Sequence, residues 1–104
     1  MVQTMKAVVF LGDRKLAVKE IPVPRPGPGQ VLIELKRAAV CGSDLHSFRR
    51  PRAGLLAQLP ADLDYVPGHE PAGVIVAVDA GCRQVKVGDR VAVHHHMGCG
   101  TCAY

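Results

Sequence analysis

The sequence predicts one small, mostly β domain over residues 1–104, arranged as a partly open β-barrel, and three observations predict it. A chain of 104 residues with 48% apolar residues has enough material for one modest hydrophobic core. Short β-branched or alternating runs recur between turns rich in glycine and proline. Almost no stretch shows the periodicity of an amphipathic helix. Short strands separated by turns are typical of sandwiches and barrels.

The amino-terminal third predicts a hairpin followed by a stiff connector. Residues 5–10 are a short β-branched run, and residues 16–21 alternate apolar with charged side chains, as a half-buried strand does. Gly12 and Asp13 between them suit a hairpin turn. Residues 22–29 contain four prolines and two glycines, so this segment cannot continue a ladder and we expect an extended surface connector.

Three further strand-like runs follow. Residues 31–40 form the longest of them and deliver the chain to Cys41. Residues 73–78 are almost continuously apolar, which predicts a buried strand. Residues 85–93 predict a tight turn and a last strand, which leads into three consecutive histidines.

Helix is expected only in two short pieces between these strands. Residues 44–48 fit one helical turn. Residues 53–59 form a weaker candidate, in which Leu55, Leu56 and Leu59 share one face.

The charge pattern excludes some classes of partner. The formal net charge is +4, but the basic residues are dispersed, and the one cluster, Arg49, Arg50 and Arg52, has no interleaved aromatic residues. A solvated loop or a phosphate-bearing cofactor explains that cluster as well as nucleic acid does, so we expect no nucleic-acid partner. No apolar run is long enough to cross a bilayer, and residues 1–11 lack the pattern of an export signal. We therefore expect a cytoplasmic protein without a membrane partner.

The cysteines favour metal binding over disulfides. Cys41, Cys82, Cys99 and Cys102 allow two disulfides in an exported protein, but without an export signal metal ligation is the better interpretation. Residues 41–46, Cys-Gly-Ser-Asp-Leu-His, and residues 68–73, Gly-His-Glu-Pro-Ala-Gly, place a thiol, an imidazole and a carboxylate beside glycines. These donor groups suit zinc, and the glycines allow sharp backbone turns around one ion.

Each of these residues also has a purely structural interpretation. Cys41 could be a small buried apolar residue, and His69 a core histidine with satisfied hydrogen bonds. Glu70 could be a surface carboxylate, Ser43 a turn hydroxyl and His46 a solvent-facing ring.

The carboxy-terminal residues leave two alternatives beside structural metal binding. Cys99 and Cys102 have the spacing of a redox pair, although no helix start follows that could lower a thiol pKa. His94 and His96 would share one face of a strand, close to Cys99, and so could replace missing thiols around a metal.

Five short motifs occur in this sequence in the same order as in a known enzyme family. With them the chain resembles the amino-terminal, GroES-like catalytic domain of the zinc-dependent medium-chain alcohol dehydrogenases. Any one of the motifs would be a weak signal, but their shared order is a strong one. They are residues 26–32, 41–46, 68–73, 87–91 and 99–102.

The resemblance implies a catalytic zinc ion. It makes Cys41 and His69 ligands, and Glu70 a third ligand or a close neighbour. Consecutive strand residues point to opposite faces, so His69 and Glu70 reach one ion only if the backbone is distorted there by Gly68 and Pro71. In this family the open zinc position takes an alcohol as its alkoxide, from which hydride passes to NAD or NADP.

The resemblance also assigns roles around the metal. Ser43 matches the hydroxyl that takes the proton of the alcohol, and His46 matches a later station of the proton relay. Asp44 matches a carboxylate that orients the ligand histidine. His95 falls where the family lines its substrate cleft, which hints at a hydroxylated substrate.

The resemblance further implies that these residues are part of a longer enzyme. Cys99 and Cys102 match half of a four-cysteine structural zinc site, and the sequence stops at Tyr104, one residue before the expected third cysteine. It contains no G-x-G-x-x-G turn, so the Rossmann nucleotide-binding domain of the parent enzyme is absent. We expect the 104 residues alone to be inactive. We also expect an exposed apolar seam and a homo-oligomer.

The sequence is consistent with three functions. The first is the amino-terminal part of a zinc-dependent NAD(P) dehydrogenase that acts on a small alcohol or polyol, or on the corresponding carbonyl compound. The second is a free-standing, zinc-binding GroES-like barrel that serves as a scaffold without catalysis. The third is a zinc-free quinone or enoyl reductase, against which the cysteine and the His-Glu pair argue.

Overall fold

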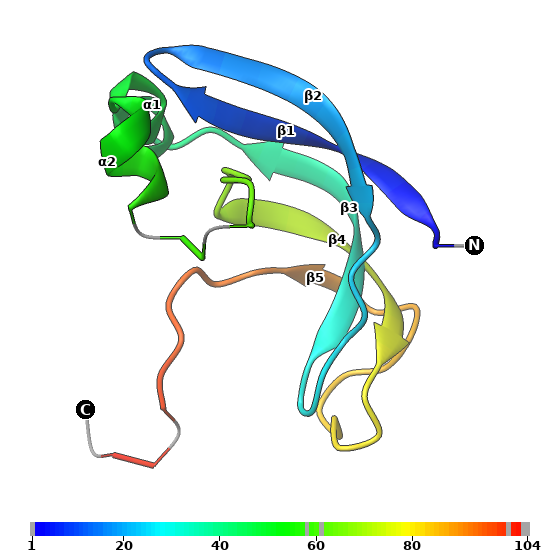
Figure 1. Cartoon of the computed structure of the whole chain (residues 1–104). Helices are drawn as coiled ribbons and strands as arrows, with labels where there is room; N and C mark the ends of the chain where they lie inside the picture. Colours follow the sequence, from blue (N-terminus) through cyan, green and yellow to red (C-terminus); the bar gives the residue numbers. More distant parts are fainter. Residues whose placement is uncertain (1, 58, 61, 100, 103–104) are drawn as a thin grey trace.

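The computed structural model describes residues 2–57, 59–60, 62–99 and 101–102, which form two β-sheets and two short helices (Figure 1). One sheet pairs β1 with β2, and the other has the order β3-β4-β5. The prediction of a mostly β, partly open barrel is confirmed, since no ladder joins the two sheets in the described residues. The elements are β1 (Thr4–Gly12), β2 (Lys15–Pro22), β3 (Val31–Ala39), α1 (Gly42–Arg49), α2 (Arg52–Leu56), β4 (Glu70–Val78) and β5 (Arg90–Ala92).

The predicted hairpin is formed by β1 and β2, which pair antiparallel from Thr4 opposite Pro22. Its two-residue loop is Asp13-Arg14, one residue later than expected, and both residues have positive φ, at 54° and 61°. That geometry matches the right-handed twist of the flanking strands. The loop rests on the end of α1, because the Asp13 amide donates to the Arg50 carbonyl at 2.8 Å.

The second sheet forms as predicted through β4, but its last strand is shorter than expected. β5 comprises only Arg90–Ala92, and the predicted tight turn precedes it at residues 87–88. The Asp89 carboxylate stabilises that turn, because it accepts hydrogen bonds from the Lys86 amide at 3.0 Å and the Lys86 ammonium at 2.7 Å. Gly88, with φ of +94°, completes that turn.

Both predicted helices exist, with different bounds. α1 begins two residues earlier than the expected turn, because the Asp44 carboxylate accepts the Cys41 amide hydrogen bond at 2.9 Å and caps the first turn. α2 ends at Leu56, so that Leu59 lies outside the helix.

The core joins the hairpin to the helices. Phe10 packs edge-on against Phe48 of α1, with ring centroids 5.4 Å apart, and stacks on Tyr65 at 6.0 Å. The Phe10 amide also donates to the Tyr65 carbonyl at 2.9 Å. The fully buried side chains are few; among the described residues they are Leu55, Ile75 and Val9.

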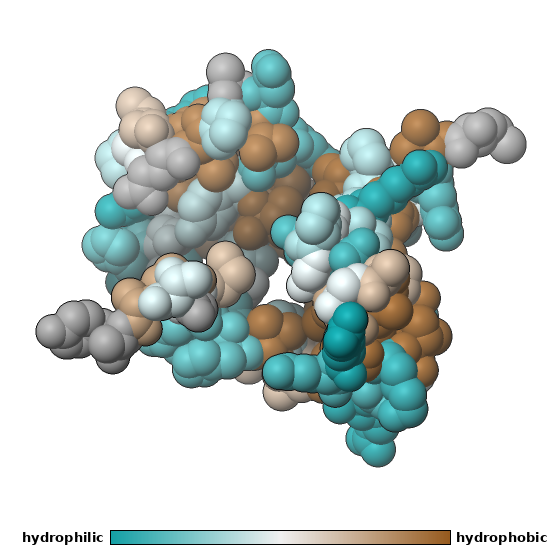
Figure 2. Space-filling view, turned by 90° about the horizontal axis from the view of Figure 1, so that it is seen from below, coloured by the Kyte–Doolittle hydropathy of each residue, from teal (hydrophilic) through white to brown (hydrophobic). Residues whose placement is uncertain are grey.

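Much apolar surface remains outside this core. The radius of gyration is 15.4 Å, whereas a compact domain of this length has roughly 13 Å. Figure 2 shows brown hydrophobic patches exposed among hydrophilic residues. On the hairpin, Val18 is 64% exposed and Leu16 is 52% exposed. Neither of the two helices in the described part of the chain is long and apolar enough to cross a membrane.

Candidate metal centre

The pairing of β3 with β4 brings two distant segments to one place. Ala39 at the end of β3 lies opposite Glu70 at the start of β4. Cys41, just after β3, and His69, just before β4, are therefore neighbours in space although they are far apart in the sequence. The sulfur of Cys41, a ring nitrogen of His69 and a carboxylate oxygen of Glu70 all lie within 4.8 Å of one another.

The backbone at residue 68 explains how His69 and Glu70 reach one point. β4 begins only at Glu70, so strand alternation does not apply to the pair. Gly68 has φ of +98°, a conformation that side chains other than that of glycine rarely adopt. The expected distortion of the backbone is therefore present at Gly68, but not at Pro71, which pairs regularly with Ala38 within β4.

The electrostatics of Cys41 favour a thiolate. The amide and hydroxyl of Ser43 donate hydrogen bonds to the sulfur and, together with His69, hold the pKa of Cys41 below its usual value. The contact with Cys41 also raises the pKa of the His69 imidazole, and the charge of Asp44 raises it further. A cation binds Cys41 as the thiolate, so metal binding here would release the proton of the thiol.

Asp44 touches both residues of that pair. Its Oδ2 accepts the hydrogen bond of the Cys41 amide at 2.9 Å, and its Oδ1 lies 3.3 Å from Nδ1 of His69. The other ring nitrogen, Nε2, lies 3.4 Å from the Ser43 hydroxyl. Nδ1 thus faces the carboxylate, and Nε2 is the nitrogen turned toward Ser43 and available to a metal.

Two predicted residues remain, His95 and His46. His95 is next to the centre, because its ring packs edge-on against that of His69 with centroids 5.5 Å apart. The pKa of His95 is lowered, mainly by repulsion from His96 and to a lesser extent by partial desolvation. His46 is exposed on α1.

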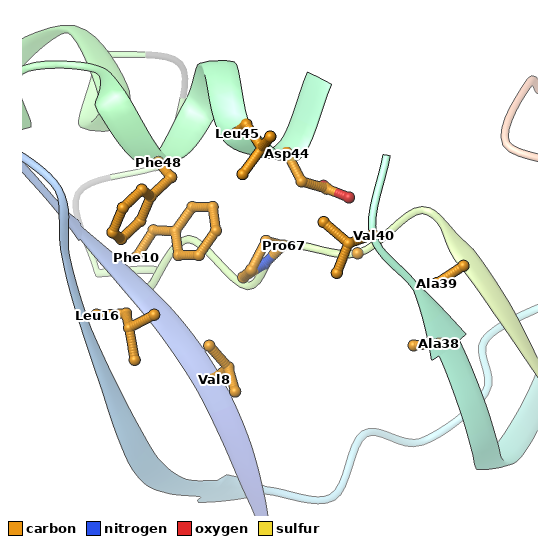
Figure 3. A pocket seen from close by; sticks show the side chains of 11 residues that line it. Val8, Phe10, Leu16, Ala38, Ala39, Val40, Asp44, Leu45, Phe48 and Pro67 are labelled. Carbon is orange, nitrogen blue, oxygen red and sulfur yellow. The ribbon is translucent and has the colours of Figure 1, made fainter. Parts of the chain in front are cut away.

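An apolar cavity of about 410 Å³ borders the centre (Figure 3). Val8, Phe10 and Leu16 of the hairpin form one wall, and α1 forms another with Leu45 and Phe48. Asp44 and Gly68 belong to its lining, so the cavity adjoins the metal-binding residues. His95, which was expected to line a substrate cleft, is not among the residues that line this cavity.

Cys99 and Cys102 form a local pair of thiols away from the metal centre. Their sulfur atoms lie 3.0 Å apart as hydrogen-bonded thiols. The Thr101 hydroxyl donates to Cys99 and, with Cys102, lowers the pKa of Cys99 to about 6. No helix start follows Cys99 in the described residues, as expected, and hydrogen bonds within the loop lower its pKa instead. No sequence pattern singled out Thr101 for this role.

The triple histidine does not adopt the expected geometry. His94 and His96 were predicted to share a strand face, but β5 ends at Ala92. Their rings nevertheless lie close, with centroids 5.3 Å apart.

Comparison with known proteins identifies the family. The family described as "Alcohol dehydrogenase GroES-like domain" matches residues 27–104. The chain belongs to this family.

Two curated relatives and one solved structure illustrate the similarity. YphC of Escherichia coli (strain K12), named an uncharacterized zinc-type alcohol dehydrogenase-like protein, is 44% identical over 102 residues. Sorbitol dehydrogenase of Bacillus subtilis (strain 168) is 40% identical over 100 residues. Each alignment covers 96% of this chain. The cobalt- and zinc-bound thermostable alcohol dehydrogenase of Pyrobaculum aerophilum superposes with a TM-score of 0.80 at 34% identity over 97% of this chain.

These relatives are much longer than this chain. It spans 29% of YphC, 28% of the sorbitol dehydrogenase and 29% of the Pyrobaculum chain. The GroES-like domain described here therefore corresponds to one part of such proteins.

This GroES-like domain offers ligands for zinc but no binding site for a dinucleotide. A thiolate, an imidazole and a carboxylate within 4.8 Å of one another are ligands that zinc prefers, and three protein ligands leave a fourth position open. The sequence contains no G-x-G-x-x-G turn, and both sheets are antiparallel in the described residues. A Rossmann nucleotide site needs parallel strands, so these residues do not build one.

Proposed function

We propose that this chain is the metal-binding catalytic part of a zinc-dependent, NAD(P)-linked dehydrogenase that acts on a small alcohol or polyol, or on the corresponding carbonyl compound. The single observation that carries the proposal is the convergence of Cys41, His69 and Glu70 within 4.8 Å. Membership of the alcohol dehydrogenase GroES-like domain family supports the reaction class.

The three converging residues would hold the zinc ion, with Nε2 of His69 as the nitrogen ligand. Zinc bound there supplies Lewis acidity, which makes an alcohol easier to deprotonate. The chain itself handles the proton. The Ser43 hydroxyl, 3.4 Å from Nε2 of His69, would accept the proton of the alcohol and at the same time release its own proton, with exposed His46 as a later station of the relay toward solvent.

Two further residues position these groups. Asp44 fixes both the Cys41 backbone and the His69 ring, so it orients two ligands at once. His95, packed against His69, borders the substrate. The sorbitol dehydrogenase relative supports a hydroxylated substrate for this site.

The longer protein would supply the groups that these residues lack. Its nucleotide-binding domain would hold NAD or NADP, and a further cysteine beyond residue 104 would complete a structural zinc site with Cys99 and Cys102. The exposed apolar surface supports a homo-oligomer. We expect the longer protein to be cytoplasmic. The 104 residues alone are expected to turn over no alcohol, because they contain no dinucleotide site.

Elemental analysis of the purified chain tests the metal centre. We expect about one zinc ion per chain at the centre, and Cys41→Ala should weaken zinc binding by about a hundredfold, since one of few strong ligands is lost. Cys99→Ala is the matched control, because it removes a thiol outside the centre. Zinc content that depends on Cys99 and not on Cys41 would contradict the proposal.

A further inference from the structure

The segment after β5 gathers three imidazoles on the surface. His94, His95 and His96 are all exposed. Their ring centroids are separated by 5.3 Å for His94 and His95, 4.0 Å for His95 and His96, and 5.3 Å for His94 and His96. Three consecutive residues on a regular strand could not gather in this way, because successive side chains alternate between faces.

The end of the sheet makes this gathering possible. β5 stops at Ala92, and the Val93 amide donates to the Pro71 carbonyl at 3.0 Å. From His94 onward the described backbone lies outside the β4–β5 ladder. The three rings therefore turn to the same side instead of alternating.

We propose that His94, His95 and His96 form a second metal site, for a borderline divalent transition-metal cation such as Co²⁺, Ni²⁺, Cu²⁺ or Zn²⁺, separate from the centre at Cys41. Imidazole is a preferred ligand of these ions, and clusters of histidine in short tracts are a common basis for binding them. All three ligands come from one short segment, so the site depends little on distant parts of the fold.

The site is less preorganised than the centre at Cys41. In the described part of the chain, the group whose donor atoms already lie within 4.8 Å of one another is Cys41, His69 and Glu70, so the three histidines must rotate their rings to meet one ion. Their exposure permits that rotation. Fixing three exposed side chains costs conformational entropy, and we expect affinity about a hundredfold weaker than at the centre.

The position of His95 makes the two sites neighbours. Its ring lies 5.5 Å from the ring of His69, a residue of the first centre. An ion held by the three histidines would thus add positive charge close to His69.

Titration with Co²⁺ alone tests the site, on the full chain without an affinity tag. A cobalt–thiolate bond produces a charge-transfer absorption that all-nitrogen ligation does not. We expect the first equivalent to give this band and a second, weaker equivalent to add ligand-field absorption without it. The double variant His94→Gln/His96→Gln should lose the second equivalent and keep the first. His46→Gln is the matched control, because it removes an exposed imidazole elsewhere and should change neither.

Two results would overturn the second site. One is a second equivalent that persists in the double variant, and the other is a second equivalent that itself carries a thiolate band that Cys99→Ser removes. The proposed centre fails in a different way. If it is wrong, Cys41→Ala leaves the first equivalent and its band unchanged, while the outcome at the three histidines is unaffected.

Discussion

The two places where cysteine sulfur lies beside other donor groups are built in opposite ways. The centre at Cys41 takes its donors from two distant segments that meet at one end of the β3–β4 pairing, and Asp44 fixes two of them. The pair of Cys99 and Cys102 lies within one short exposed loop, and its hydrogen bonds come from that loop. The first arrangement exists only when the sheet is folded, whereas the second can form in a chain without a sheet.

This difference decides how each site responds to its surroundings. Where ligands converge from distant segments, the free energy of metal binding contributes to folding, and any damage to the sheet lowers the affinity for the metal. Where ligands are local, reactivity follows the nearest hydrogen-bond donors. Changes in the sheet, around His69 and in the carboxy-terminal loop should therefore have separable effects.

The largest effect is expected from Gly73→Ala in β4. A Cβ atom there would overlap the Glu34 carbonyl oxygen and the Ile33 side chain, so β3 and β4 must move apart. We expect a loss of about 3 kcal/mol in the free energy of unfolding, measured by denaturant titration, together with weaker metal binding at Cys41. The reactivity of Cys99 toward alkylating reagents should not change.

Gly54→Ala is the matched control for that substitution. Gly54 lies in α2, and a Cβ atom added there meets nothing within 4 Å. The change should be neutral or stabilise the helix by about 0.5 kcal/mol. If Gly54→Ala weakened metal binding as much as Gly73→Ala, the sheet would not be the element that builds the centre.

The next effect in size is expected from Asp44→Asn. The amide still caps α1 but no longer places a negative charge 3.3 Å from Nδ1 of His69. Loss of such an orienting partner typically weakens metal binding, here by about tenfold, as measured by competition with a chelator. Asp62→Asn, at an exposed carboxylate outside the centre, is the control. Equal metal affinity in the Asp44 variant and the unaltered chain would contradict an orienting role.

The fold and the centre could be predicted to different degrees from the sequence. The hairpin and β4 follow from alternating and apolar runs, and the family motifs pointed to Cys41, His69 and Glu70. The β3–β4 register, which brings them together, could not be derived, since it depends on long-range pairing. β5 and the turn before it, which the Asp89 side chain stabilises, were predicted, but the end of the strand at Ala92 was not. The gathering of His94 and His96 follows from where that strand ends.

A smaller effect, confined to the loop, is expected from Thr101→Val. The Thr101 hydroxyl is the main reason that the pKa of Cys99 is lowered from 9.0 to about 6. Above that pKa the thiolate predominates and reacts, and below it the thiol does not. The rate of Cys99 alkylation should therefore be half-maximal near the pKa of about 6 in the unaltered chain, and at higher pH in the variant. An unchanged pH profile would show that the hydroxyl does not stabilise the thiolate.

The smallest effect is expected at the end of the β3–β4 pair that is remote from the metal. The Asp79 carboxylate accepts hydrogen bonds from the amides of Gly29 and Gly81, each at 3.0 Å, and so fastens the connector before β3 to the turn after β4. Those bonds, the Gly29 amide first, lower the pKa of Asp79 below its ordinary 3.8.

The sign of the pH dependence follows from that shift. A lowered pKa means that the contribution to stability is present above pH 3.8 and is lost as the pH falls through the still lower pKa of the folded state. Asp79→Asn should therefore lower the denaturant midpoint slightly near neutral pH, and the difference from the unaltered chain should shrink below about pH 4. Metal binding at Cys41 should stay the same, because the opposite end of the sheet holds its ligands. A metal affinity that fell with Asp79→Asn would mean that the whole β3–β4 pair, and not only its end at Ala39 and Glu70, sets the geometry of the centre.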